Sequence, residues 1–118
     1  MAILTATGKQ FIVDRLRGTV VTEQKYVAWG TGAAAEAVGN TALTTPSAEA
    51  RTLGTMSSPS AALYRVVGTI TSASTQTITE VGLFDATTAG VMMVRAIFTG
   101  VPMVSGDSIA FTLDLSVT

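Results

Sequence analysis

The sequence predicts an all-β fold: an antiparallel β-sandwich of the jelly-roll or immunoglobulin-like kind, with a short N-terminal helix and a long loop or arm. Short runs of β-branched and aromatic residues recur along the chain, with small turn-forming residues between them. The last run alternates strictly between apolar and small or polar residues, which predicts one buried and one wet face. Its apolar residues are Ile109, Phe111, Leu113, Leu115 and Val117. Strands at such short intervals are typical of antiparallel sheets.

The N-terminal stretch predicts a short helix. Thr7 and Gln10 have the spacing of a capping box, and Gly18 supplies a stop signal. Ile12 and Leu16 lie four residues apart and therefore share one apolar face. Because a helix of about three turns is marginal in isolation, we expect this face to dock on a sheet.

Length and composition predict the organisation of the chain. We expect a single domain, 1–118, in which residues 1–24 form the N-terminal helix or arm and residues 30–60 an extended loop. The 30–60 segment is rich in Ala, Gly, Thr and Ser and has few large apolar residues. A loop of this length is usually functional or disordered, and in an assembly protein we expect it to be an arm that contacts a neighbouring protein. Trp29, just before it, is expected to anchor the core.

The stretch 77–98 predicts a β-hairpin around a run of small turn-forming residues. Placing Asp85 opposite Gly90 puts Glu80 opposite Arg95, which predicts a cross-strand ion pair with a structural role. The first face of the hairpin is then wholly apolar, and carries Val81, Leu83, Met92, Val94, Ala96 and Phe98. The second face mixes large apolar residues with the ion pair, the composition expected of a surface that becomes buried on docking.

The second face supplies the predicted interface. We expect Phe84, Met93 and Ile97 to contact either the docked N-terminal helix or another subunit, and we assign Leu43 of the long loop to the same interface. Only 13% of the residues are charged, against roughly 25% in an average soluble domain. A surface with so little charge favours assembly, so we expect an oligomer.

The composition argues against an enzyme. His and Cys are both absent, which removes the commonest general base, the commonest transition-metal ligand and the thiolate nucleophile. Asp85 and Asp107 have the setting of turn residues, and the glycines of 30–32 lack the remainder of a phosphate-loop pattern. We therefore predict no catalytic, cofactor-binding or metal-binding residues. The net charge of −1 predicts no direct binding of nucleic acid, and the short apolar runs predict no membrane span.

Five blocks of the sequence resemble small virion structural proteins of tailed bacteriophages. They are KYVAWGTG (25–32), NTALTTP (40–46), ITEVGLFDATTAG (78–90), VRAIF (94–98) and SGDSIAFTLDL (105–115). The resemblance implies a sandwich-like protomer that acts without an enzyme site or cofactor. Within this class, we predict a capsid decoration (cement) protein that binds and stabilises the major capsid shell. The alternative is a tail, fibre or baseplate component, for which the chain lacks heptads and triple-helical repeats.

The same resemblance implies the partners and the location. The protein would act as a homo-oligomer, often a trimer in such proteins, and would bind the major capsid protein or other virion structural proteins. It would be made in the cytoplasm of the bacterial host and would end on the virion, at the capsid surface. Neither nucleic acid nor a membrane is implied as a direct partner.

Overall fold

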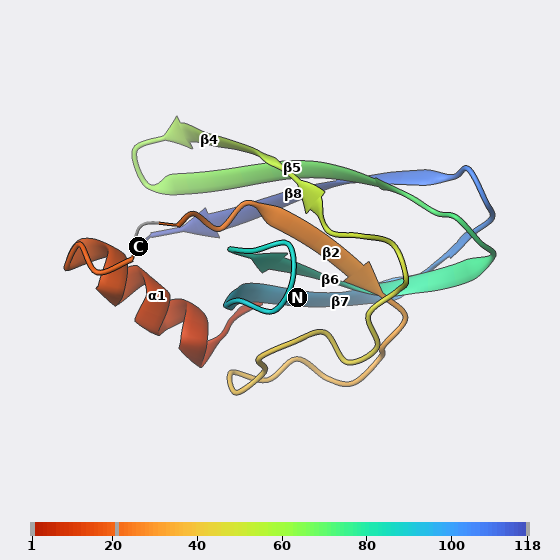
Figure 1. The fold of residues 1–118 in the computed structure, drawn as a ribbon, viewed down its shortest axis with the longest axis horizontal. Helices are drawn as coiled ribbons and strands as arrows, with labels where there is room; N and C mark the ends of the chain where they lie inside the picture. The colour runs from red at the N-terminus through yellow and green to blue at the C-terminus, as the bar shows by residue number, and fades with distance from the viewer. Residues whose placement is uncertain (1, 21, 118) are drawn as a thin grey trace.

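The computed structural model describes residues 2–20 and 22–117, and it contains two antiparallel sheets that pack face to face (Figure 1). The elements are β1 (Ala2–Leu4), α1 (Ala6–Leu16), β2 (Tyr26–Gly30), β3 (Thr52–Leu53), β4 (Thr55–Ser60), β5 (Leu63–Thr71), β6 (Gln76–Phe84), β7 (Met92–Met103) and β8 (Ser108–Ser116). One sheet has the order β1-β7-β6-β2-β3 and the other the order β4-β5-β8. The predicted all-β, antiparallel architecture is therefore confirmed.

The predicted 30–60 loop is wrong at its C-terminal end. Residues 52–53 and 55–60 form β3 and β4, so the irregular part of the chain ends at Arg51. β4 pairs with β5 although most of its side chains are small and all are exposed. Strand pairing uses backbone groups, so a Ser- and Thr-rich stretch can form an edge strand that its composition does not reveal.

The N-terminal helix is capped by Thr5 instead of the predicted Thr7. Thr5 Oγ1 accepts the N–H of Gly8 at 2.9 Å, and the buried hydroxyl also donates to the Met92 carbonyl of β7. A Cβ on Gly8 would lie 2.6 Å from the Met93 carbonyl oxygen, so the helix approaches β7 closely only because this residue is glycine. Tertiary contact with β7 therefore selects the cap.

The helix ends as predicted, and Ile12 of the predicted face packs against the core, but Leu16 of that face does not. Gly18 has a φ of +74°, the left-handed conformation that commonly terminates a helix. Phe11 provides the buried contact, whereas Leu16, predicted to dock, is 84% exposed. Within residues 2–20 and 22–117, no helix has the length and apolar character needed to cross a membrane.

The β6–β7 hairpin is present, but the predicted register is wrong by two residues. Val81 pairs with Ala96 and Leu83 with Val94, and Met93 is an extra residue that forms a bulge beside the next pair. The side chains of Val81, Leu83, Val94, Ala96 and Phe98 still face the core, because a shift of two residues keeps each side chain on its face. The bulge exchanges the sides of its two neighbouring methionines: Met93 lies in the main core, and Met92 belongs to a second cluster on the opposite side of the sheet.

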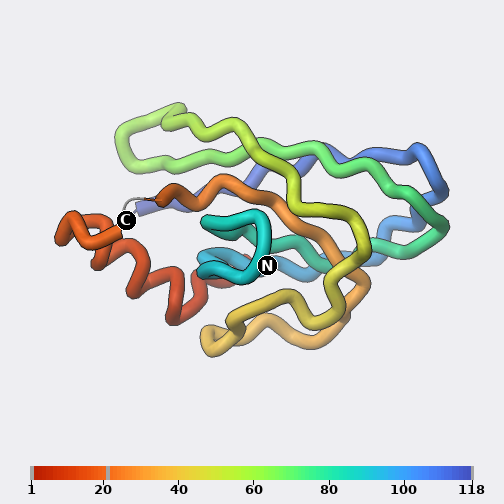
Figure 2. Tube along the Cα trace, viewed as in Figure 1, coloured from red at the N-terminus to blue at the C-terminus, as the bar shows by residue number. Residues whose placement is uncertain are grey.

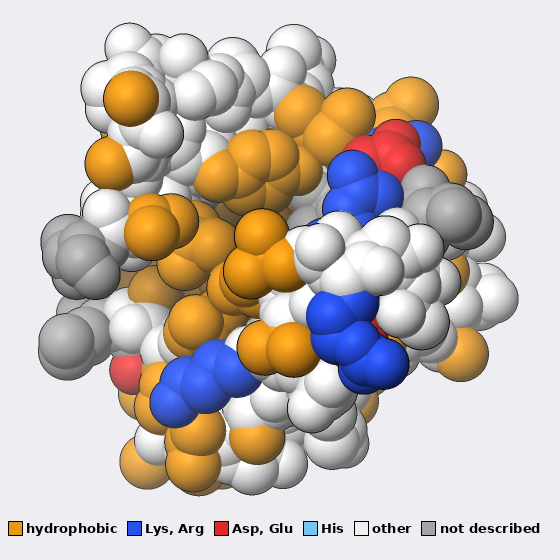
Figure 3. Space-filling view, turned by 90° about the vertical axis from the view of Figure 1, so that its left-hand side faces the viewer, with side chains coloured by type: hydrophobic (Ala, Val, Ile, Leu, Met, Phe, Trp, Pro, Cys, Tyr) orange, Lys and Arg blue, Asp and Glu red, His pale blue; other side chains and the backbone are white. Residues whose placement is uncertain are grey.

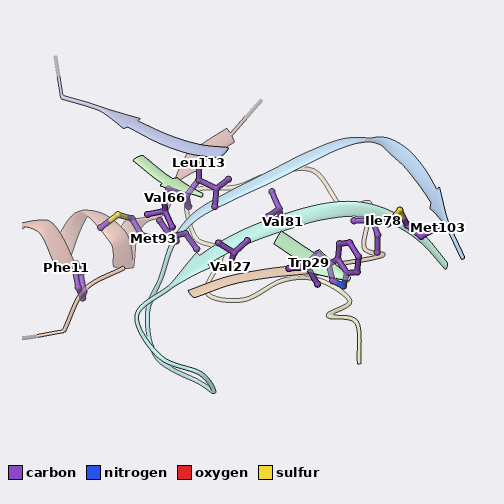
Figure 4. Packing of buried hydrophobic residues seen from close by; sticks show 12 residues of the cluster. Phe11, Val27, Trp29, Val66, Ile78, Val81, Met93, Met103 and Leu113 are labelled. Carbon is purple, nitrogen blue, oxygen red and sulfur yellow. The ribbon is translucent and has the colours of Figure 1, made fainter. Parts of the chain in front are cut away.

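The main core lies between the two sheets (Figure 4). Trp29 is buried there and meets Phe111 edge to face, with ring centroids 6.3 Å apart, which confirms its predicted role as an anchor. Leu113 is buried, and the other apolar residues of β8 pack against the same cluster. Val117 is exposed, contrary to the alternation, because β8 ends at Ser116.

Candidate interaction surfaces

The outer face of the five-stranded sheet carries a buried ion pair. Arg95 Nε donates to Glu80 Oε1 at 3.1 Å, and both side chains are 0% exposed. The predicted cross-strand pair is therefore confirmed, although its members are diagonal neighbours: Glu80 lies opposite Ile97 and Arg95 opposite Gly82. Two charges taken out of water need further hydrogen-bond partners to offset the cost of desolvation.

Residues 31–46, which we call the cover segment, supply partners for the carboxylate. Figure 2 shows this segment leaving β2 and returning along the side of the five-stranded sheet that faces away from the other sheet. The backbone N–H groups of Gly32, Thr44 and Thr45 donate to the Glu80 carboxylate at 3.0, 2.9 and 2.8 Å. With the bond from Arg95, Glu80 accepts four hydrogen bonds without any contact with solvent.

The cover segment also supplies partners for the guanidinium. Arg95 Nη2 donates to the Ala34 carbonyl at 2.9 Å and to Thr44 Oγ1 at 3.0 Å. Its Nη1 donates to the Ala35 carbonyl at 3.3 Å and to Asn40 Oδ1 at 3.2 Å. The ion pair therefore acts as the anchor of a long loop, and this part of the chain is packed on its own sheet instead of extending as the predicted arm.

Three of the four predicted interface residues lie inside the chain's own packing. Leu43 of the cover segment is 5% exposed and packs with Phe84 and Met92 in the second cluster, and Met93 shares the main core with Phe11 of α1. Ile97 is partly buried, and its N–H donates to Glu36 Oε2 at 2.8 Å. Met93 was predicted to contact either the N-terminal helix or another subunit, and in the structure it packs with the helix. We therefore revise the expected interface.

Arg51, which the sequence did not single out, completes this side of the molecule. Its guanidinium carbon lies 3.6 Å from the centroid of the Phe84 ring, and its Nη1 donates to the carbonyls of Ala86 and Ala89 in the hairpin turn. Burial lowers the pKa of Arg51, and the nearby Asp85 carboxylate opposes that shift. Arg51 thus covers Phe84 and holds the turn, a contact between residues more than thirty positions apart that no local pattern indicates.

An apolar hollow lies between α1 and the adjacent end of the sandwich. Figure 3 shows hydrophobic side chains gathered on this end of the molecule. The hollow has a volume of about 300 Å³, and its apolar lining consists of Phe11, Ile12, Leu16, Met56, Tyr64, Met93 and Leu115. We call it the helix-end hollow. Its apolar lining comes from α1, β4, β5, β7 and β8, and Glu23 and Gln24 of the α1–β2 connection add polar groups, so its existence depends on the tertiary fold.

The polar part of the lining of the helix-end hollow consists of Arg15, Glu23 and Gln24, beside the Tyr64 hydroxyl. The Tyr64 hydroxyl donates to the Gln24 carbonyl, and burial, helped by Glu23 and opposed by Arg15, raises the pKa of Tyr64. Gln24 is 2% exposed and its Nε2 donates to the Val91 carbonyl, whereas its Oε1 has no hydrogen-bond partner among the described residues. The hollow therefore combines an apolar wall with a few charged and polar groups.

Comparison with protein-family models, with curated proteins and with solved structures found no match to this chain. Among residues 2–20 and 22–117, no group of three or more His, Cys, Asp or Glu side chains is arranged to hold a metal ion. Function is therefore inferred below from the residues and their geometry.

Proposed function

We propose that the protein is a non-enzymatic structural component of a bacteriophage virion, a capsid decoration (cement) protein that binds and stabilises the major capsid shell. Two findings support the proposal: the five sequence blocks that resemble such proteins, and a β-rich fold compatible with them. In this proposal the sandwich is a variant of the jelly-roll or immunoglobulin-like kind. The protein works as a homo-oligomer at the capsid surface, after synthesis in the host cytoplasm.

The helix-end hollow is the observation that carries the proposal. Leu16 is 84% exposed and Met56 is 41% exposed at its rim, so large apolar side chains stand in water beside an apolar depression. Burying such surface contributes roughly 25 cal/mol per Å². An apolar centre with a few polar groups is also the usual anatomy of a protein–protein contact. In this proposal, a projecting apolar side chain of the capsid protein fills the hollow.

Mass spectrometry of capsids that have been purified free of tails tests the proposal directly, in the phage that encodes this chain. We expect the protein on these capsids in a fixed ratio to the shell protein. Its recovery in the tail fraction alone would support a tail, fibre or baseplate role instead. Its absence from both fractions would overturn the virion assignment.

A binding experiment tests the helix-end hollow itself. The double variant Leu16→Ser, Met56→Ser should lose binding to bare capsids in a co-sedimentation assay while the protomer stays folded, because both side chains are exposed at the rim. Val104→Ser is the matched control, since Val104 is exposed in the β7–β8 turn at the opposite end of the molecule (Figure 1). Equal binding by the double variant and the control would place the contact elsewhere.

A further inference from the structure

The four edges of the two sheets differ in their protection against pairing with another chain. β1 has three residues and β3 has two, and β4 contains Pro59 and a break in register between Ser57 and Ser60. Short strands, proline and bulges are devices that block edge pairing. β8 has none of them: its nine residues pair with β5 without interruption, and it contains no Gly, Pro or Lys. Its other side has no partner strand among the described residues.

The register of β8 on β5 shows which backbone groups of β8 face the open edge. At one end of the ladder the N–H of Ser72 donates to the Asp107 carbonyl at 2.7 Å, and at the other the N–H of Val117 donates to the Ala62 carbonyl at 2.8 Å. Hydrogen-bonded pairs alternate along an antiparallel ladder, so the odd-numbered residues of β8 bond to β5. The even-numbered residues direct their N–H and C=O groups outward; they are Ser108, Ala110, Thr112, Asp114 and Ser116.

An apolar cleft runs beside this edge, between β8 and the five-stranded sheet. It has a volume of about 400 Å³, and Phe98, Ile109 and Phe111 in its wall are only partly buried although they belong to the core layer. A strand added to β8 would complete the outward hydrogen bonds and also shield these side chains from water. Both contributions favour an occupant at this edge.

We propose that β8 pairs antiparallel with β8 of a second copy, around a two-fold axis at Thr112. This register overlaps all nine residues of the strand and brings the outward groups of the even-numbered residues together. Thr112 lies opposite Thr112 of the second copy, and Asp114 lies opposite Ala110. Asp114 is the one charged residue of the strand, so the register sets no like charges against each other. The edge is self-complementary, and a second copy is its occupant.

Disulfide trapping tests the register, because the chain contains no cysteine of its own. Thr112→Cys should give a covalent dimer under mild oxidation, since Cα atoms of such a pair lie about 5.5 Å apart, within the range of a disulfide. Ala110→Cys would lie opposite Asp114 and should stay unlinked. Thr69→Cys is the second control, because Thr69 is exposed on β5 directly beside Ala110 and away from the edge.

A second variant tests the hydrogen bonds across the axis. Thr112→Pro removes an outward N–H from each copy and leaves the ladder to β5 intact, so we expect the dissociation constant from sedimentation equilibrium to rise at least about tenfold. The control Ala110→Lys places a cation opposite Asp114 and should leave the association unchanged or tighter. Thermal melts establish that each variant is folded.

Three results would overturn the pairing. They are a mass of 12.1 kDa for the wild-type protein at every concentration tested, equal trapping of all three cysteine variants, and an oligomer that Thr112→Pro leaves intact. The inference does not rest on the virion role, since these experiments use the isolated protein. Trapping at Thr112 together with absence from virions would support the dimer and remove the proposed function. Presence on capsids without trapping at Thr112 would support the proposed function and remove the dimer.

Discussion

The outer faces of the two sheets carry the same kind of ion pair in opposite surroundings. On the five-stranded sheet, Glu80 and Arg95 are 0% exposed beneath the cover segment. On the three-stranded sheet, Arg65 and Asp114 lie directly opposite each other on β5 and β8 and are 36% and 37% exposed. Their geometry is the better of the two, with bonds of 2.7 and 2.9 Å. The comparison shows that surroundings, and not the pair alone, decide what an ion pair does.

The buried pair fixes a loop that could not hold itself in place. The cover segment has few large apolar side chains, of which Leu43 alone is buried, so hydrophobic burial can contribute little to its docking. Its backbone N–H and C=O groups instead bond to charged partners, and such bonds are stronger than neutral ones. The side chains of the exposed pair bond to each other and remain partly open to solvent, so the pair holds no loop in place.

Arg95→Ala should have the largest effect. It leaves the Glu80 carboxylate buried without its counter-ion, and breaking a buried pair in this way typically costs about 3–5 kcal/mol. Urea unfolding measures the loss of stability, and hydrogen exchange should show that Gly32, Thr44 and Thr45 lose protection. Arg65→Ala is the matched control on the open face. Equal destabilisation by the two variants would mean that the cover segment does not increase the contribution of the buried ion pair to stability.

Leu43→Ala should have the next largest effect. We expect it to lower the free energy of unfolding by about 2–5 kcal/mol, the usual range for truncating a buried leucine. Leu43 is the apolar contact between the cover segment and the sheet, where it packs against Phe84 and Met92. Val38→Ala, in the same segment but exposed, should leave the melting temperature almost unchanged. If the two variants melt alike, the cover is held by its polar contacts alone.

A smaller effect is expected at Glu49, and it should depend on pH. Burial raises the pKa of this carboxyl, but hydrogen bonds from Gln76, Trp29 and the Ala73 N–H outweigh burial and lower it below the ordinary value of 4.5. A lowered folded-state pKa stabilises the protein above the unfolded-state value, and that contribution is lost as pH falls through the folded-state value. The stability difference between wild type and Glu49→Gln should therefore shrink below pH 4.5. A difference that does not change between neutral and acidic urea titrations would contradict this assignment.

Arg65→Ala should have the smallest effect. The hydrogen bond from Arg65 lowers the pKa of Asp114, yet both groups face solvent, where the pair is screened. We expect a small change in melting temperature at low ionic strength, and none at about 1 M salt, where the Debye length is near 3 Å. A large change that persists in salt would show that this face is covered in solution, for example by another copy.

Local patterns were sufficient for several elements. The alternation of 108–117 predicted the buried side chains of β8 up to Leu115, and Gly18 predicted the end of the helix. The alternation of β8 depends on the two-residue period of a strand, and the helix end depends on the backbone conformation of one glycine. Residues that are close in sequence specify both properties. The Glu80–Arg95 pair was also predictable, because a register shift of two residues keeps both side chains on one face and still leaves them within reach.

Other features were decided by the tertiary structure. The Met93 bulge depends on how β6 and β7 meet, and the choice of Thr5 over Thr7 as the cap depends on the contact with β7. Leu43 was assigned to an arm, since no local pattern indicates that the buried charges of Glu80 and Arg95 bind its segment to the sheet. The sequence alone therefore determined the apolar faces of β8 and of most of the β6–β7 hairpin, whereas tertiary structure decided what covers each face, because burial is a property of the residues that meet in space.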